Sequence, residues 1–424
     1  MPHSHPTTAP IAQRRVVIAA TVGNMLEFYD FTIYSYFALI IGHQFFPQAS
    51  SQAAVLLSFA IFALGFVSHR LSGIVLGHYA DRKGRRPALT LTIVLMGLGS
   101  AIIGLMPPYT TLGIAAPLLI TLARLIQGFA QGGEFGTATA MLIETGDERS
   151  RGYRARWQLA SQGAASLLGA AITTGLHFML SEEAMNSWGW RLPFLIGVLI
   201  VPVGLYLRRH LHDEFNASIK HTRIPITASL IRTWWLCVFS IMGMTVASYT
   251  LMYYVPTYSI QYLHLTPRLS MIVALAAAVM SLLMCPLFGM ACDHFHRRKP
   301  IALVGRIMLM VLVYPSFWVM GHLPTVGTLT ALIIVLMFFY TMGSTPAYAL
   351  MPENFPKHAR AGYLASAYAV SVALFGGTAQ LVCGWLIHIT GRTLAPAWYM
   401  VVCVFISIIT IAQLKETGLH ALAK

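Results

Sequence analysis

Two apolar stretches of this sequence carry polar and ionisable side chains at intervals of three and four residues. The first set is Glu27, Asp30 and Tyr34, and the second is Arg124, Gln127, Gln131 and Glu134. Residues at these intervals lie on one face of a helix, so each set predicts a polar stripe along an apolar helix. A carboxylate among apolar side chains favours its protonated form, whereas a neighbouring arginine favours the charged form. Two such stripes could therefore couple the binding of a proton to the binding of an anion.

The members of the two stripes have different expected roles. Arg124 suits an anion, because its planar guanidinium can hold a carboxylate at two oxygens. We expect Asp30 to carry the proton, since it lies deeper in its apolar run than Glu27; Glu134 is a further candidate. The uncharged members of the stripes would bind the substrate beside Arg124. The alternative is a permanent buried ion pair that only holds the two helices together.

The composition shows what kind of element carries these stripes. The chain has 424 residues, of which 57% are hydrophobic and only 10% are charged, and its mean hydropathy is +0.67. A soluble protein carries roughly 25% charged residues, so this chain is expected to lie in a bilayer. The five cysteines show no metal-ligand spacing, and we expect no metal site. A spanning helix needs about 20 apolar residues, and twelve such spans are expected at 16–42, 54–77, 88–106, 112–143, 155–180, 189–207, 232–262, 269–290, 300–320, 326–350, 361–388 and 395–414.

The net charge of +14 could indicate a nucleic-acid partner, but its distribution argues against one. Most lysines and arginines lie in the two tails and in alternate loops, while the intervening loops hold only Arg268 and Arg392. By the positive-inside rule, this asymmetry places both termini and the basic loops in the cytoplasm. The charge therefore indicates membrane topology, and no nucleic-acid partner is expected.

An internal repeat divides the chain. The pattern G-x-x-x-D-x-x-x-R-R begins at Gly77 and again at Gly289, half the chain later, and the sequences around Glu144 and Glu353 form a second matching pair. Repeats of this kind place the binding site between two halves, near the middle of the membrane. We expect an all-α protein with a cytoplasmic tail (1–15), an N-terminal six-helix bundle (16–207), a cytoplasmic loop (208–231), a C-terminal six-helix bundle (232–414) and a second tail (415–424).

The repeated loops predict a breakable clasp on the cytoplasmic face. Gly77 would let two helices approach closely, Asp81 would accept hydrogen bonds at a helix N-terminus, and the arginines would bridge to acids such as Glu144. The alternative is that these charges serve topology alone. The expected gate residues are Gly77, Asp81, Arg82, Gly84, Arg85, Arg86 and Glu144 in the first half, and Asp293, Arg297, Arg298, Glu353 and Arg360 in the second.

These motifs resemble the major facilitator superfamily, whose members carry the same loop between their second and third helices. Three further strings, 23–31, 124–134 and 375–378, are similar to the metabolite:proton symporter family. The likeness covers nearly the whole chain. It implies twelve transmembrane helices in two six-helix bundles, and import of organic acids, betaines or shikimate together with protons.

One string narrows the resemblance. Residues 156–162 read Arg-Trp-Gln-Leu-Ala-Ser-Gln, which is similar to a stretch of the citrate and tricarballylate branch. Gln158 and Gln162 lie one turn apart and could hydrogen-bond a polyanion, or only another helix. Tyr368 lies on a helix that is expected to line the cavity, where this chain reads Ala-Tyr-Ala instead of Ser-Tyr-Asn or Ala-Tyr-Ser. That departure leaves room for an unfamiliar substrate.

We therefore expect a symporter in the inner membrane that imports a small organic anion, such as a di- or tricarboxylate, with protons and works as a monomer. The short stretch after the last span lacks a heptad tail, which argues against an osmosensing betaine carrier. Open alternatives are a proton-driven exporter of a metabolite or siderophore, and a symporter for 2-oxoglutarate, shikimate, proline or betaine. A non-transporting sensor would not need the clasp and the buried charges. We expect no enzymatic activity and no cofactor besides the coupling proton, because the sequence contains no phosphate loop, nucleophile elbow or catalytic cluster.

Overall fold

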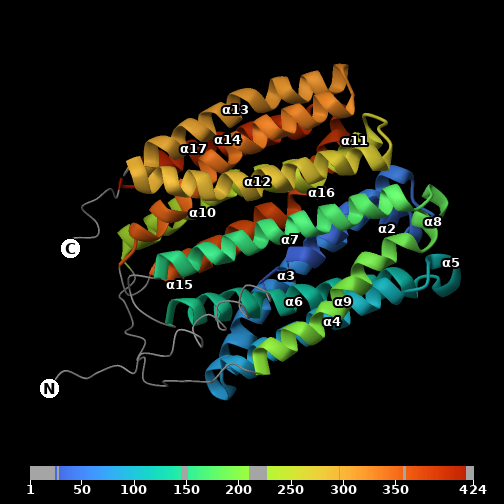
Figure 1. Ribbon diagram of the computed structural model, residues 1–424, viewed down its shortest axis with the longest axis horizontal. Coiled ribbons are helices and arrows are strands. Elements are labelled where there is room, and N and C mark those ends of the chain that lie inside the picture. The colour runs from blue at the N-terminus through green and yellow to red at the C-terminus, as the bar shows by residue number, and fades with distance from the viewer. Residues whose placement is uncertain are drawn as a thin grey trace.

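Helices make up all of the regular structure in the described part of the chain (Figure 1). The structure is a computed structural model that describes residues 24–25, 28–144, 151–209, 227–295, 297–356 and 360–416. Residues 28–36 are helical and lead into α2 (Ala38–Phe45). The first half continues with α3 (Ser51–Lys83), α4 (Arg85–Leu105), α5 (Tyr109–Leu112), α6 (Ala115–Glu144), α7 (Arg151–Met179), α8 (Glu182–Ser187), η2 (Gly189–Arg191) and α9 (Leu192–Arg209). The second half contains α10 (Ala228–Ser248), η3 (Tyr249–Tyr254), α11 (Val255–Gln261), α12 (Pro267–Phe295), α13 (Arg298–His322), α14 (Val326–Glu353), α15 (Arg360–Ser371), η4 (Val372–Gly376), α16 (Gly377–Thr390) and α17 (Ala395–Gln413).

Long apolar helices occupy the predicted spans. Within the described ranges, nine helical segments are long and apolar enough to cross a membrane. They are Ser51–His69, Arg86–Leu105, Gly189–Tyr206, Ala228–Gln261, Pro267–Ala291, Arg298–His322, Val326–Glu353, Gly362–Thr390 and Ala395–Gln413. The helix that ends at Phe45, together with α6 and α7, covers the other predicted positions. The predicted all-α membrane fold is thus confirmed.

The helices pack mainly within the two halves of the chain. In the first half α6 lies against α3 and α4, and α4 lies against α9; in the second half α14 lies against α12 and α13, and α17 against α10 and α13. The most extensive helix contacts between the halves are those of α7 with α12 and of α3 with α16. Figure 1 shows α7 and α12 running side by side where the blue-to-green and yellow-to-red halves meet.

Glycines set the closest helix crossing of the first half. A methyl group at Gly128 of α6 would lie 1.8 Å from the carbonyl oxygen of Gly65 in α3, and one at Gly132 would lie 2.0 Å from that of His69. Glycines four residues apart allow two membrane helices to bring their backbones together. This crossing holds α3 and α6 in one rigid pair.

Two helices of the second half are interrupted by a π-helical segment. The segment η3 joins α10 to α11, and η4 joins α15 to α16. Pro256, just after η3, has no N–H to donate to the carbonyl four residues earlier, which favours a wider turn there. Such segments recur at functional sites, and both border the cavity described below.

Candidate functional site

A buried polar network lies inside the first half, and we name it the Asp30 cluster: Asp30, Tyr34, Ser100, Arg124 and Gln127. Arg124 Nη1 donates to Gln127 Oε1 at 2.7 Å, and Gln127 Nε2 donates to Ser100 Oγ at 2.9 Å and to Asp30 Oδ2 at 3.5 Å. The Ser100 hydroxyl donates to the same Asp30 oxygen. Asp30, Arg124 and Gln127 are 5%, 4% and 2% exposed, so the network lies away from lipid and water.

The buried guanidinium of Arg124 contacts the faces of aromatic rings. Its guanidinium carbon lies 4.4 Å from the ring centroid of Tyr34 and 5.1 Å from that of Phe62. The Tyr34 hydroxyl in turn donates to the carbonyl of Ser58 in α3 at 3.2 Å. Aromatic faces attract a cation most strongly where water is excluded, so this platform compensates part of the desolvation of Arg124.

Two atoms of the cluster lack a hydrogen-bond partner among the described residues, Asp30 Oδ1 and Arg124 Nε. Arg124 is connected to Asp30 through Gln127 and not by a direct ion pair. Each unpaired polar atom at this depth costs free energy. The cluster thus keeps one acceptor and one donor ready for a further partner.

The repeat predicts a binding site between the halves, whereas the Asp30 carboxylate is oriented within the first half. The carboxylate points to Ser100 of α4 and to Gly197 of α9, where a methyl group would lie 2.9 Å from Asp30 Oδ1. Asp30 and Arg124 are therefore packed within the first half. The spacing within each stripe indicates which residues share a helix face, but spacing alone does not fix the rotation of a helix about its axis.

A small cavity lies between the halves, and one member of the stripe on α6 lines it. Gln131 lines it from the first half, while Tyr249 and Tyr368 line it from the second. His69 of α3 also lines it, a residue that the sequence reasoning missed although it is an ionisable group within an expected span. The cavity encloses about 20 Å³, the space of about one water molecule.

Aromatic rings pack the contact between the halves next to the cavity. The ring centroid of Phe31 lies 4.3 Å from Phe62 and 5.2 Å from Phe66 in the first half, and 5.2 Å from Tyr249 and 5.7 Å from Tyr253 in the second. Phe31 follows Asp30 directly in the chain. Phe31 thus joins the two halves one residue away from Asp30.

Polar contacts across the halves were also missed by the sequence reasoning. Gln380 Nε2 donates to Ser35 Oγ at 2.9 Å, and the hydroxyls of Ser166 and Tyr253 lie 3.0 Å apart. Gln380 stands where the family pattern has proline, a departure that could have pointed to it. Gln162, a predicted substrate residue, is half-buried beside Gly163, which faces Leu282 of α12.

The centre of the second half contains a buried cation that the sequence reasoning also missed. We name it the Arg306 cluster: Arg306, Ser240, Gly343 and Ser407. Arg306 is fully buried, and its Nε donates to the Gly343 carbonyl at 3.1 Å. Its Nη1 donates to Ser240 Oγ at 2.9 Å, to Ser407 Oγ at 2.6 Å and to the Ser407 carbonyl at 3.0 Å. All of these acceptors are neutral.

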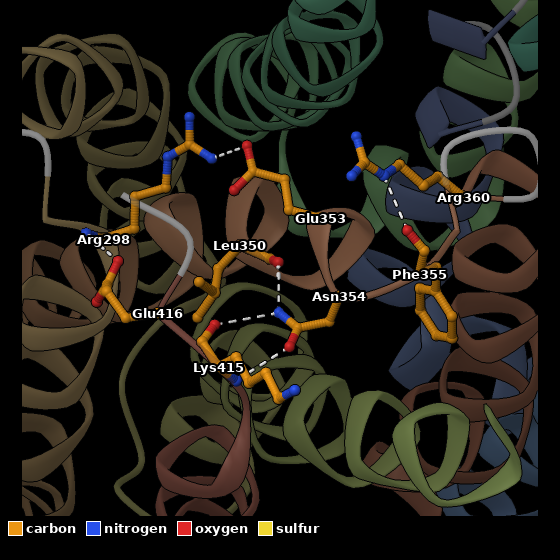
Figure 2. A network of polar contacts seen from close by, with 8 residues as sticks. All are labelled: Arg298, Leu350, Glu353, Asn354, Phe355, Arg360, Lys415 and Glu416. Carbon is orange, nitrogen blue, oxygen red and sulfur yellow. Dashed lines mark hydrogen bonds and ion pairs between the residues drawn. The ribbon is translucent and has the colours of Figure 1, made fainter. Parts of the chain in front are cut away.

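Figure 2 shows the polar contacts of the residues predicted for the clasp of the second half. Arg298 at the start of α13 forms an ion pair with Glu353 at the end of α14, and Arg360 Nε donates to the Phe355 carbonyl at 2.9 Å. Glu416 accepts from the backbone N–H of Arg298 at 3.2 Å and of Lys299 at 2.9 Å. Glu416 thus caps α13, because the first N–H groups of a helix have no partner within it. Arg297 is exposed.

The matching loop of the first half contains two predicted gate glycines, Gly77 and Gly84. Gly84 has φ +97°, a conformation that glycine adopts without strain, and it separates α3 from α4. The expected close helix approach at Gly77 is wrong for this structure, because no atom of the described part lies within 4 Å of a methyl group built there. Arg82 is exposed and Arg86 is half-buried.

Several predicted residues cannot be placed as side chains. Glu27 lies outside the described residues. The following belong to described helices, but their side chains lie outside the described set: Asp81, Arg85, Glu134, Glu144, Gln158 and Asp293. In the described part of the chain, no group of His, Cys, Asp or Glu side chains could hold a metal ion.

Comparison with known proteins agrees with this architecture. The family model described as Major Facilitator Superfamily matches residues 20–376. The citrate-proton symporter of Klebsiella pneumoniae is 32% identical over 399 residues, which cover 93% of this chain and 90% of that protein. The proline/betaine transporter of Salmonella typhimurium is also 32% identical, over 427 residues that cover 96% and 84%.

A solved structure confirms the fold. The crystal structure of a D-xylose-proton symporter superposes with a TM-score of 0.77, covering 95% of this chain and 97% of that one, at 17% identity. At this identity the likeness concerns the fold alone. Together with the nine apolar spans, these matches identify a multi-pass protein of the cytoplasmic membrane. The chain therefore belongs to the major facilitator superfamily, in its metabolite:proton symporter family, and is a transporter and not an enzyme.

Proposed function

We propose that this protein imports a small organic anion, a di- or tricarboxylate such as citrate, together with protons by alternating access. The observation that carries the proposal is the Asp30 cluster. It holds a buried carboxylate and a buried guanidinium that are connected through one glutamine, and one oxygen and one N–H of this pair have no partner among the described residues. An ionisable group at membrane depth is costly and is retained for function.

The geometry suggests how the two events would be coupled. Ser100 and Gln127 already donate to Asp30 Oδ2, so a proton would be taken up at Oδ1. The neutralised Asp30 would no longer compensate the charge of Arg124 through Gln127. Arg124 would then attract a substrate carboxylate more strongly, because its field inside the bundle would be less screened. Glu27 and Glu134 are further candidates for the proton.

The charge balance supports an anion as substrate. In the second half, from residue 228 onward, the acids are Asp293, Glu353 and Glu416, which the sequence places at the cytoplasmic ends of the spans. Arg306 therefore has no acidic counterpart at membrane depth in its own half. An anion between the halves would be attracted by both buried arginines. The similarity to a citrate-proton symporter and the string 156–162 agree with this assignment.

A second candidate is a zwitterion such as betaine or proline, the substrates named for other relatives of equal identity. The supporting observation is the aromatic lining of the cavity, where Phe28, Phe31, Phe66 and Tyr249 meet. Aromatic faces bind quaternary ammonium groups. The two candidates differ in net charge, which makes them easy to separate.

Uptake by proteoliposomes tests the proposal. The purified protein would be reconstituted with an alkaline interior and an acidic exterior, and the accumulation of labelled citrate, tricarballylate, 2-oxoglutarate, shikimate, proline and betaine would be measured with and without a protonophore. We expect protonophore-sensitive accumulation of a di- or tricarboxylate. Accumulation of betaine or proline but of no acid would reject the anion, and accumulation of no compound under this gradient would favour the exporter.

The remaining predictions belong to the same scheme. We propose that Gln131, Tyr368, Gln158 and Gln162 contact the substrate once the cavity opens, and that the bundles 16–207 and 232–414 move as units of a monomer. The two clasps would hold the cytoplasmic side closed and break when it opens. The ion pair of Arg298 with Glu353 supports this role in the second half.

A further inference from the structure

His69 occupies a position between the two halves that the scheme above does not use. It lines the central cavity from α3, opposite Tyr249 at the start of η3 and Tyr368 of α15, and next to Gln131 of α6. The other residues that line the cavity, such as Phe31, are apolar. His69 is thus an ionisable group within a mostly apolar contact between the halves.

The backbone of His69 is held firmly in place. Its carbonyl oxygen lies at the α3–α6 crossing, 2.0 Å from a methyl group built at Gly132, and it also accepts from Ser72 Oγ at 2.9 Å. A side chain on such a fixed backbone keeps its direction when the opposite wall moves. The opposite wall includes Tyr249 of η3 and Val372 of η4, both part of π-helical segments.

The chemistry of the cavity favours an anionic ligand group at His69. Histidine changes its charge between pH 5 and 8. Among the described side chains that line the cavity with His69, the phenols of Tyr249 and Tyr368 ordinarily stay neutral in this range. The described side chains of Phe28, Phe31 and Gln131 are uncharged. A protonated imidazole here would be a cation among donors that can all hydrogen-bond a carboxylate.

We propose that His69 contacts the transported anion, binding one of its carboxylates as an imidazolium and making the affinity depend on pH. The inference rests on the proposed function and adds a substrate residue to it. At about 20 Å³ the cavity does not admit a carboxylic acid in the present conformation. Displacement of the η3 and η4 wall would open it, with His69 and Gln131 remaining on the fixed wall.

Substrate affinity of a neutral variant tests this inference. Citrate binding to purified wild type and His69→Gln would be measured by calorimetry at pH values below and above the titration range of histidine. We expect the variant to bind about tenfold more weakly at the acidic pH, the loss of one charge-assisted hydrogen bond. The two proteins should converge at the alkaline pH. The ionisation of citrate and of Asp30 changes with pH in both proteins, so its effect cancels in the ratio of the two affinities.

A matched control lies on the same helix. His78 of α3 is exposed and lines no part of the cavity, so His78→Gln should bind citrate like wild type at both pH values. If His69→Gln does not give a monodisperse protein, His69→Asn replaces it. A ratio between wild type and variant that does not change with pH would overturn the proposal, as would equal affinity at acidic pH.

The outcome separates this inference from the proposed function. If wild type binds and accumulates citrate while His69→Gln does so equally well, only the role of His69 is rejected. If wild type binds betaine or proline and no acid, the anion assignment itself is rejected, and the role of His69 is rejected with it. A pH-dependent difference confined to His69→Gln supports both.

Discussion

The two halves of this transporter each bury charged side chains among packed helices, and the two clusters differ in how completely their polar atoms are hydrogen-bonded. In the Asp30 cluster, Asp30 Oδ1 and Arg124 Nε lack hydrogen-bond partners among the described residues. In the Arg306 cluster, the guanidinium makes four hydrogen bonds to the backbone and hydroxyls of α10, α14 and α17. Similar burial therefore leads to unsatisfied groups in one half and to bonded groups in the other.

This difference indicates that the two clusters have different functions. Unsatisfied buried groups cost stability and persist where a ligand or proton completes them. A bonded guanidinium instead holds helices together and supplies a constant positive field. We infer that the first half contains the centre that changes its protonation, whereas the second half contains a centre that does not change.

The largest expected effect is at Asp30, where a substitution should abolish coupled transport without lowering stability. Asp30→Asn removes the titratable group, so gradient-driven accumulation in proteoliposomes should be lost while counterflow exchange of substrate persists. The melting temperature in detergent should stay the same or rise, since a costly buried carboxylate is removed. Unchanged accumulation would exclude Asp30 from the mechanism.

The next effect concerns the tight crossing of α3 and α6 beside the Asp30 cluster. Gly128→Ala would bring a methyl group 1.8 Å from the Gly65 carbonyl, so α3 and α6 must separate. We expect a loss of about 1–3 kcal/mol in unfolding free energy and strongly reduced transport. Gly175→Ala in α7 is the control, because no described atom lies within 4 Å of its added methyl. Equal melting temperatures of the two variants would contradict this packing.

The effect at Arg306 should be the reverse of that at Asp30. Arg306→Gln removes charge-assisted bonds to three helices, and we expect the unfolding free energy to fall by about 2 kcal/mol. The folded fraction should still couple transport to the proton gradient. Normal stability together with uncoupled transport would show that the two centres have exchanged roles.

The smallest effect is expected at the clasp of the second half. Arg298 and Glu353 are 21% and 17% exposed, and partly exposed ion pairs contribute about 0–1 kcal/mol. Glu353→Gln should therefore shift the melting temperature little, while cysteines introduced on the cytoplasmic side should react faster with a membrane-impermeant thiol reagent. Glu416→Gln provides a comparison at the helix cap. Unchanged labelling would mean that the pair does not hold a gate.

Much of this arrangement could be predicted from the sequence. The long apolar runs predicted the helices, and the spacing within each stripe predicted that Arg124 and Gln127 would share one face of their helix. The rotation of each helix about its axis could not be predicted. Lipid tails are as apolar as a protein interior, so hydrophobicity does not show which side of a membrane helix faces the protein. Asp30 therefore faces α4 and α9 instead of the cavity.

Other features left a signal in the sequence that was not used. Arg306 and His69 are ionisable residues within expected spans, which is the same signal that identified Asp30. Ser100 and Ser407 carried no such signal, because serine is common in membrane helices and bonds its own backbone as readily as a distant partner. Their importance follows only from which helices become neighbours.

The π-helical segment η3 makes the length of its helix a functional parameter. A π-helical segment accommodates one residue more than an α-helix does, so deletion of one residue between Tyr249 and Tyr254 would restore a regular α-helix while the flanking turns keep their direction. The side chains within the segment, among them Tyr249 and Tyr253 at the contact with Phe31, would then be redistributed around the helix, although none had been replaced. Such a shortening would thus separate the contribution of the wide turn itself from that of the side chains it carries.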